Sequence, residues 1–165
     1  IMTTTPKKKT TTTREVKLPP NPFIHEILDY VDSQKTKPKK VQALQEYRDD
    51  SLTAILIWNF DDRVVSAVPE GQVPYKENEV PVGTDHTSLR REWKNLYHFI
   101  KGGNDTLSSL RRETMFIQLL EGLHPEEAKI ICLVKDKNLT EKYKLTREIV
   151  AAAFPDIAWG LHRGT

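Results

Sequence analysis

The chain has 165 residues, of which 38% are hydrophobic and 29% are charged, and its mean hydropathy is -0.55. This length suits one domain, and the composition supplies one apolar core but is too polar for a membrane protein. The longest apolar run, residues 54–58, is far below the roughly 18 residues that a membrane-spanning helix needs. The single cysteine, Cys132, excludes an internal disulfide and favours a reducing cytoplasm.

Charge is distributed unevenly along the chain. Residues 1–20 contain five basic residues and one acidic residue, a net charge of +4, and the remaining residues carry 20 basic and 22 acidic groups. Residues 1–20 are rich in Thr, Lys and Pro and have few large apolar side chains, so we expect a disordered basic arm. The rest of the chain is nearly neutral, so any attraction to nucleic acid must come from this arm and from local patches.

The first part of the domain predicts three short helices. Apolar residues at a spacing of three to four predict a helix at about residues 22–33, with Asn21 as its N-cap. Pro38 opens a second helix, and Asp49 or Asp50 caps a third over residues 51–60. The apolar run in this third helix could also form a strand, but the sequence offers no second good strand to pair with it.

Residues 64–86 contain five proline and glycine residues, which predict an irregular loop. Regular structure resumes at residues 89–100, where the apolar spacing predicts a helix with Trp93 and Tyr97 on its inner face. Asn104 or Asp105 is the expected cap of the next helix, which ends at Gly122 and turns Leu110 inward.

Two more helices complete the expected fold. One starts at Pro125, with Glu126 and Glu127 in its first turn, and the last begins near Thr146 and ends before Pro155. The sequence therefore predicts an all-α, compact bundle of about seven short helices over residues 21–158, followed by a C-terminal tail at 159–165.

Catalytic and metal-binding motifs are absent from the sequence. The five histidines are scattered without an i, i+4 pair, and His124 is interpreted as a neighbour of a helix cap. Asp61 and Asp62 are interpreted as a solvated pair at a helix end, and Cys132 as a core residue. No nucleotide-binding glycine motif occurs either. We therefore expect no enzyme activity, no metal and no cofactor.

Basic residues form the more informative pattern, because they gather in three clusters that could contact DNA phosphates. The last cluster ends at the expected start of the final helix, where free N–H groups favour a phosphate. The alternative is that these residues are ordinary solvated charges, since acidic residues are interspersed with them. The candidate DNA-binding residues are Arg90, Arg91 and Lys94; Arg111 and Arg112; and Lys135, Lys137, Lys142, Lys144, Thr146 and Arg147.

The order of these helices carries a resemblance. A helix, the Gly102-Gly103 turn, two more helices, the connection at 134–139 and a last helix closed by Phe154-Pro155 follow one another over residues 87–155. This series resembles the helical N-terminal DNA-binding domain of ATP-dependent, phage-type DNA ligases. The chain is also similar to small proteins of T4-like tailed phages, including cyanophages. The resemblance covers roughly residues 22–157 and implies a ligase-like all-α fold and double-stranded DNA as partner.

Two departures from the ligase pattern limit what the resemblance implies. The glycine expected in the connection before the last helix is absent, and residues 141–144 occupy that region. The K-x-D-G motif of the ligase nucleotidyltransferase is also absent, so nick sealing is not expected.

We expect a non-enzymatic phage accessory protein that contacts the duplex backbone during DNA replication, recombination or repair. Its expected location is the cytoplasm of the infected host cell or the virion, with no membrane contact. Phage replication or virion proteins are further expected partners. The alternative is a protein-interaction or virion-associated protein that reuses the ligase-like fold without binding DNA.

Overall fold

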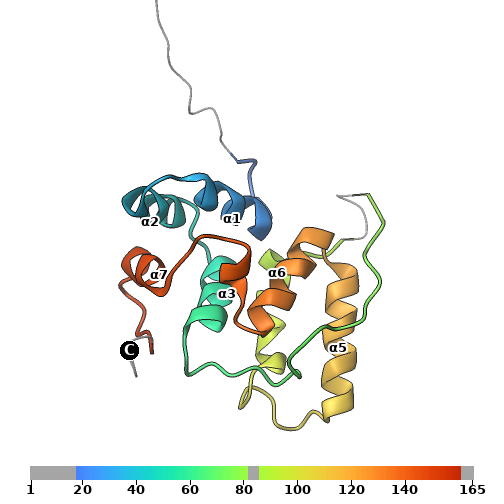
Figure 1. The fold of residues 1–165 in the computed structure, drawn as a ribbon. Helices are drawn as coiled ribbons and strands as arrows, with labels where there is room; N and C mark the ends of the chain where they lie inside the picture. The colour runs from blue at the N-terminus through green and yellow to red at the C-terminus, as the bar shows by residue number, and fades with distance from the viewer. Residues whose placement is uncertain (1–17, 82–85, 161–165) are drawn as a thin grey trace, which may run out of the picture.

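The computed structural model describes residues 18–81 and 86–160, which form seven α-helices and two 3-10 helices (Figure 1). These residues contain no strand and only two isolated β-bridges. The expected all-α fold of about seven helices is confirmed. In chain order the elements are α1 (Ile24–Ser33), α2 (Lys37–Glu46), α3 (Asp50–Phe60), α4 (Leu89–Glu92), η2 (Trp93–Phe99), α5 (Ser109–Gly122), α6 (Pro125–Lys135), η3 (Leu139–Glu141) and α7 (Arg147–Ala153).

Helix α3 lies at the centre of the bundle (Figure 1). It packs against α4, η2 and α6, whereas α2 packs against α1 and α7, and α5 packs against α6 and η2. Leu52, Ile55 and Leu56 of α3 are fully buried, as are Phe116 of α5 and Ile131 of α6. Burial of one such side chain contributes about 1.5–3 kcal/mol to the free energy of unfolding, so these apolar contacts hold the helices together. Within the described ranges, no helix is long and apolar enough to cross a membrane.

Short polar side chains start most of these helices. Thr36, Asp49, Ser88, Ser108 and Thr146 each accept a hydrogen bond from a backbone N–H in the first turn of the helix that follows. Each such cap satisfies a backbone donor that has no partner within the helix, and contributes about 1 kcal/mol.

Three expectations about helix boundaries and faces were wrong. The N-cap of α1 is Phe23 rather than Asn21, which has a left-handed backbone with a φ of 52°. Helix α5 starts after Ser108 because the Asn104 side chain instead accepts the N–H of Thr106 and stabilises a turn. Leu110, expected inside, lies in the first turn of α5 and is 77% exposed.

The segment 93–99 also departs from expectation, because it forms the 3-10 helix η2 and not an α-helix. A 3-10 helix has three residues per turn, so side chains three apart share a side. Leu96 and Phe99 are therefore buried on one side, whereas Tyr97 lies on another and is 48% exposed. The expected inward position of Tyr97 was wrong.

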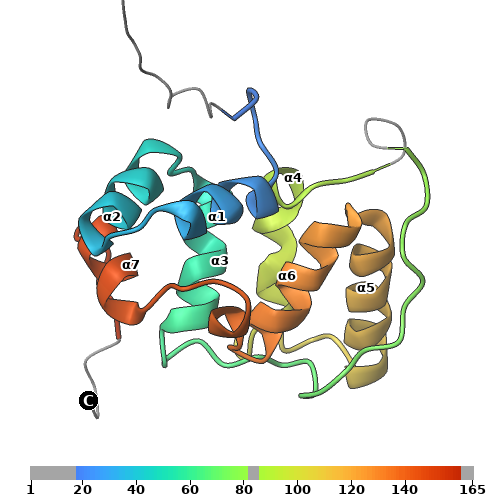
Figure 2. The same cartoon turned by 45° about the horizontal axis from the view of Figure 1, so that its top comes forward.

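The expected loop at 64–86 is irregular in its described part and runs past α6 and α5 (Figure 2). Two contacts attach it to α5: the backbone N–H of Lys76 donates to the Glu121 carboxylate, and the Asn78 side-chain amide donates to the Gly122 carbonyl. The segment is thus held on the helices by polar contacts although it has no regular structure.

Most of the expected basic arm, residues 1–17, lies outside the described residues, as do 161–165 of the expected tail. Leu18 packs against the core. At the other end, Trp159 donates its indole N–H to the Phe154 carbonyl at 3.0 Å, and the N–H of Gly160 donates to the buried Asp61 carboxylate. The folded part therefore extends beyond the boundary at residue 158.

A buried carboxylate joins three helices. Glu127 of α6 has no exposed surface, and its two oxygens accept the backbone N–H of Ile24 at 2.8 Å and that of Leu89 at 2.9 Å. Ile24 and Leu89 are the first residues of α1 and α4, whose positive N-terminal ends favour a negative charge. Burial raises the pKa of Glu127, and the two N–H bonds oppose that rise. One side chain thus fixes α1 and α4 against α6.

Changing Glu127→Gln tests this link. The amide keeps one acceptor oxygen but turns an NH₂ group toward one of the two helix N-termini, so a buried N–H loses its partner. We expect the free energy of unfolding, measured by urea denaturation, to fall by about 1–3 kcal/mol. The exposed control Glu70→Gln should leave it unchanged. Equal stability of both variants and the original protein would show that the link is unimportant.

Candidate nucleic-acid interface

The candidate DNA-binding residues fall on two separate parts of the fold. One group lies on α4, η2 and the start of α5, and the other runs from the end of α6 to the start of α7. The first group consists of Arg90, Arg91, Lys94, Arg111 and Arg112, and the second of Lys135, Lys137, Lys142, Lys144, Thr146 and Arg147.

Two arginines of the first group bind groups of the protein itself. The Arg90 guanidinium lies 2.5 Å from the Asp49 carboxylate and also donates to the Pro22 carbonyl. The Arg112 guanidinium donates to the carbonyls of His98 and Asn104, each at 2.8 Å. These arginines satisfy carbonyls in irregular segments, so a phosphate would have to displace existing bonds to reach them.

Lys135 and Lys137 have comparable internal roles. Lys135 is only 2% exposed, and its ammonium donates to the carbonyls of Pro69 and Gly71 at 2.8 and 3.0 Å. Its third partner is the adjacent carboxylate of Asp136. The ammonium thereby attaches the loop to the end of α6, and burial leaves no surface on which it can meet a phosphate.

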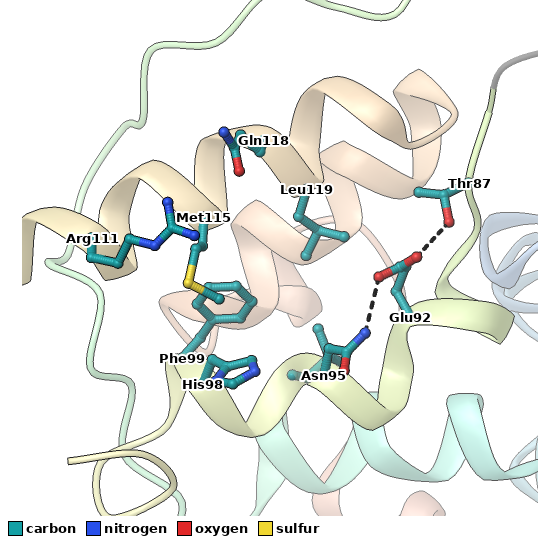
Figure 3. Close-up of a pocket in the computed structure, with 10 residues that line it drawn as sticks. Thr87, Glu92, Asn95, His98, Phe99, Arg111, Met115, Gln118 and Leu119 are labelled. Carbon is teal, nitrogen blue, oxygen red and sulfur yellow. Dashed lines mark hydrogen bonds between the residues drawn. The ribbon is translucent and has the colours of Figure 1, made fainter. Parts of the chain in front are cut away.

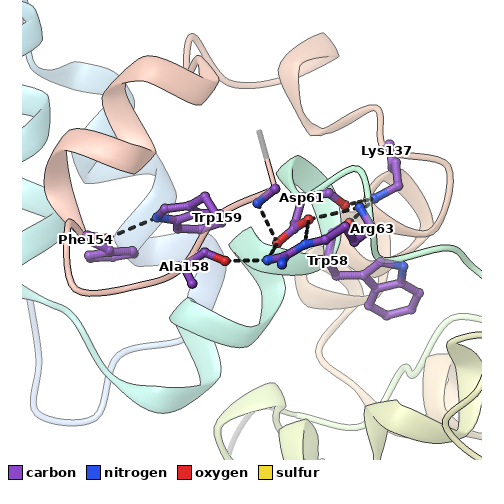
Figure 4. Close-up of polar contacts among 8 residues, drawn as sticks. Trp58, Asp61, Arg63, Lys137, Phe154, Ala158 and Trp159 are labelled. Atoms are coloured by element: carbon purple, nitrogen blue, oxygen red, sulfur yellow. Dashed lines mark hydrogen bonds and ion pairs between the residues drawn. The ribbon is translucent and has the colours of Figure 1, made fainter. Parts of the chain in front are cut away.

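The Lys137 ammonium donates to the carbonyls of Trp58 and Asp61 at 2.6 and 3.0 Å (Figure 4). These carbonyls lie at the C-terminal end of α3, where a cation is favoured. Lys137 itself has a φ of 59°, a left-handed conformation that usually calls for glycine at a helix end. Burial lowers the pKa of Lys137, and the nearby Asp62 and Asp61 oppose that effect. Lys137 therefore acts as a structural cap of α3.

Asp61 was expected to be solvated, and this was wrong. It is 3% exposed, and its carboxylate accepts bonds from the Arg63 guanidinium and from the N–H of Gly160 (Figure 4). The hydrogen bonds from Arg63 lower the pKa of Asp61 to about 2, against the opposing effect of burial. A Cβ at Gly160 would lie 2.6 Å from an Asp61 oxygen, so the close approach requires glycine. The Arg63 guanidinium also bonds the Ala158 carbonyl.

The connection between α6 and α7 is largely neutralised by ion pairs. Lys142 lies 3.2 Å from Glu126, and Arg147 lies 2.9 Å from Asp62. The Thr146 hydroxyl caps α7 by accepting a bond from a backbone N–H. The Lys144 side chain is exposed and forms no ion pair with any described residue. One unpaired cation therefore remains in this second group.

The first group of candidate residues, on α4, η2 and the start of α5, has more cations without ion pairs to described residues than the second group. Arg91, Lys94, Lys101 and Arg111 are exposed and form no ion pair within residues 18–81 and 86–160; we call them the α4–α5 basic surface. Residues 86–112 contain six basic and two acidic residues, a net charge of +4, whereas the chain as a whole carries +2. Lys101 was not among the candidate residues, although the local charge excess could have indicated it. This arrangement can bind a polyanion.

A pocket of about 370 Å³ lies between η2 and α5, beside this surface (Figure 3). Arg111 and Gln118 line it from α5, and Asn95 and His98 line it from η2. The Glu92 carboxylate accepts bonds from the Thr87 hydroxyl at 2.7 Å and from the Asn95 amide at 3.3 Å (Figure 3). The Glu92 carboxylate, which lines the same pocket as Arg111, thus already has neutral partners within the protein.

Three histidines that are far apart in the sequence meet near the start of α6. The ring centroid of His124 lies 4.6 Å from that of His25 and 5.9 Å from that of His86. Burial, and then His124, lowers the pKa of His25; burial, and then His86, lowers the pKa of His124. Nδ1 of His124 also accepts the N–H of Glu126, capping α6. In the described ranges, no group of three His, Cys, Asp or Glu residues could hold a metal ion.

Because the pKa values of these two histidines are lowered, the unfolded chain binds more protons than the folded one once the pH falls below about 6.5. We expect the melting temperature to decrease as the pH falls from about 7 to about 5. The double variant His25→Asn/His124→Asn keeps a capping side chain at the start of α6 and should flatten this decrease. His98→Asn, outside the cluster, should retain it. The same slope in all three proteins would contradict the role of the cluster.

Comparison with known proteins gives one match. A model of a family of unknown function, DUF6433, matches residues 27–141, which is more than half of the chain and spans α1 to η3. No curated protein and no solved structure matches the chain. The resemblance to ligase DNA-binding domains and to phage proteins therefore stays a prediction. The chain belongs to the DUF6433 family.

Proposed function

We propose that this protein binds double-stranded DNA by contacting backbone phosphates with the α4–α5 basic surface. The observation that carries the proposal is the presence of four exposed cations, without ion pairs to described residues, within residues 91–111, which run from α4 through η2 to the start of α5. Each cation that neutralises a phosphate releases counterions, which provides affinity without sequence readout. The predicted role is that of a non-enzymatic accessory protein in phage DNA replication, recombination or repair, within the infected cell or virion.

The electrostatics favour this surface over the connection between α6 and α7. A phosphate that approaches Lys142 or Arg147 must compete with Glu126 or Asp62, and the competing carboxylates repel the phosphate. Arg91 carries no such competitor among the described residues. We therefore expect a phosphate to bind more favourably to the α4–α5 basic surface than to Lys142 or Arg147, because no paired carboxylate has to be displaced.

A second candidate function is protein interaction without DNA. It is favoured by the near-neutral charge of the chain beyond residue 20, which carries 20 basic and 22 acidic groups. Such a body provides no long-range attraction to DNA, so binding depends on the local surface and on the basic N-terminal residues. The two candidate functions differ in whether the protein binds duplex DNA with an affinity that falls as the salt concentration rises.

The double variant Arg91→Ala/Arg111→Ala tests the proposal in fluorescence anisotropy with labelled duplex across a salt series. The log-log salt slope changes by about 0.9 for each phosphate contact, so we expect a decrease of about one to two in its magnitude, with weaker binding at low salt. The control Lys35→Ala/Lys39→Ala removes the same charge from exposed positions in and beside α2, which packs mainly against α1 and α7. An equal loss in the control would refute the assigned surface, and no binding of the original protein at about 50 mM salt would refute the function.

The pair Lys144→Ala/Arg147→Ala separates the two parts of the fold. Arg147 is paired with Asp62, so we expect this variant to lose less affinity than Arg91→Ala/Arg111→Ala in the same salt series. A greater loss would place the DNA on the connection before α7, as the ligase resemblance implies.

A further inference from the structure

An apolar groove lies between α3, η2 and the turn that follows η2. Its volume is about 540 Å³, and apolar side chains such as Ile57, Trp93, Tyr97 and Ile100 form its lining. Lys94 and Lys101 are the charged residues of that lining, so the groove combines aromatic surface with positive charge alone. Both lysines also belong to the α4–α5 basic surface.

The two aromatic side chains from η2 are accessible. Tyr97 is 48% exposed, and Trp93 is partly exposed. The indole N–H groups of Trp58 and Trp159 bond Ser66 and Phe154, whereas that of Trp93 bonds no described residue. Trp93 therefore offers both a ring and a free donor to a ligand.

Positive charge lies close to these rings. The Lys94 ammonium is 6.0 Å from the centroid of the Trp93 ring, and Lys101 lines the same groove. Gly102, next to Lys101, has a φ of 85° and free space where a Cβ would stand, so a ligand can approach the backbone there. Proteins that bind single-stranded nucleic acid combine aromatic rings, on which the bases stack, with cations that contact the phosphates of the nucleic-acid backbone.

We propose that this groove binds unpaired bases, so that the protein prefers DNA with a single-stranded gap or end to intact duplex. The inference rests on the proposed function and specifies which form of DNA the same surface binds. Bases in an intact duplex are stacked inside the helix and cannot enter the groove, whereas an unpaired base can stack on Trp93 or Tyr97. Its flanking phosphates then lie near Lys94 and Lys101.

An acidic peptide with an aromatic residue is the competing ligand for such a groove. The number of cations favours DNA, because Arg91 and Arg111, which do not line the groove, add positive charge in the same part of the chain without ion pairs to described residues. A DNA strand carries one phosphate per nucleotide and places a base between successive charges. This regular alternation matches a lining that combines the rings of Trp93 and Tyr97 with two ammonium groups.

The test measures affinity of the full chain for three labelled DNAs of equal length: a single strand, a gapped duplex and an intact duplex. We expect Tyr97→Ala and Trp93→Leu each to weaken binding of the single strand and the gapped duplex by about tenfold, because stacking of one base contributes on that scale. Intact duplex should be affected less than about twofold. The exposed apolar control Leu110→Ala should change none of the three affinities.

A spectroscopic measurement adds a second readout. Stacking of a base on Trp93 should quench tryptophan fluorescence when the single strand is added, and most of this quenching should disappear in Trp93→Leu. Tyr97→Ala keeps the test valid if Trp93→Leu does not fold, since Tyr97 is half exposed. Circular dichroism melting curves establish which variants are folded.

Equal affinity for all three DNAs, with no change in the aromatic variants, would overturn the groove inference and leave the proposed function intact. Absence of binding to every DNA at about 50 mM salt would instead refute the proposed function. If a labelled Glu-rich peptide containing phenylalanine binds and the single strand does not, the groove is a peptide site and the inference is wrong. Selective loss of single-strand and gapped-duplex binding in the aromatic variants would support it.

Discussion

The Glu127 carboxylate is the constraint on which the arrangement of the two ends of the bundle depends. Burying a charge is costly, and this charge is stabilised mainly because the first residues of α1 and α4 both direct an N–H at it. Since η2 continues directly from α4, the same bond sets where Lys94 and Tyr97 lie relative to α6. The basic surface is thus positioned by a residue that lies on another helix and never reaches the solvent.

Cations in this protein serve two purposes, and their bonding partners distinguish them. Lys135, Lys137 and Arg112 direct their charges at backbone carbonyls that irregular segments and a helix end leave without partners. An ammonium with two or three such acceptors can be buried at little net cost, and it holds the chain where no regular structure does. The cations left for a ligand are therefore fewer than the 25 basic residues of the sequence suggest.

Helix positions follow from the sequence because apolar spacing and capping residues are local properties. Contacts between distant segments explain what the sequence did not predict. The burial of Asp61 depends on Gly160, which lies far along the chain. The start of α5 is a local exception, because Asn104 stabilises a turn and Ser108 caps the helix within the same segment. The histidine cluster, by contrast, arises only when α1, α6 and the segment before α4 come together. Which lysines and arginines remain free is a consequence of these long-range contacts, so charge clusters alone could not identify the interface.

The three-residue period of η2 explains how one short helix can contribute to the core, a groove and a pocket at once. Leu96 and Phe99 form its buried side, Lys94 and Tyr97 face the groove, and Asn95 and His98 line the pocket of Figure 3. An α-helix of 3.6 residues per turn would instead place Tyr97 close to the face of Trp93, as the apolar spacing predicted. The 3-10 geometry is weaker than α-helical geometry, and here it is retained where Glu127 fixes the preceding turn and Arg112 bonds the His98 carbonyl at the far end. The exposed ring of Tyr97 is therefore a consequence of how both ends of η2 are held.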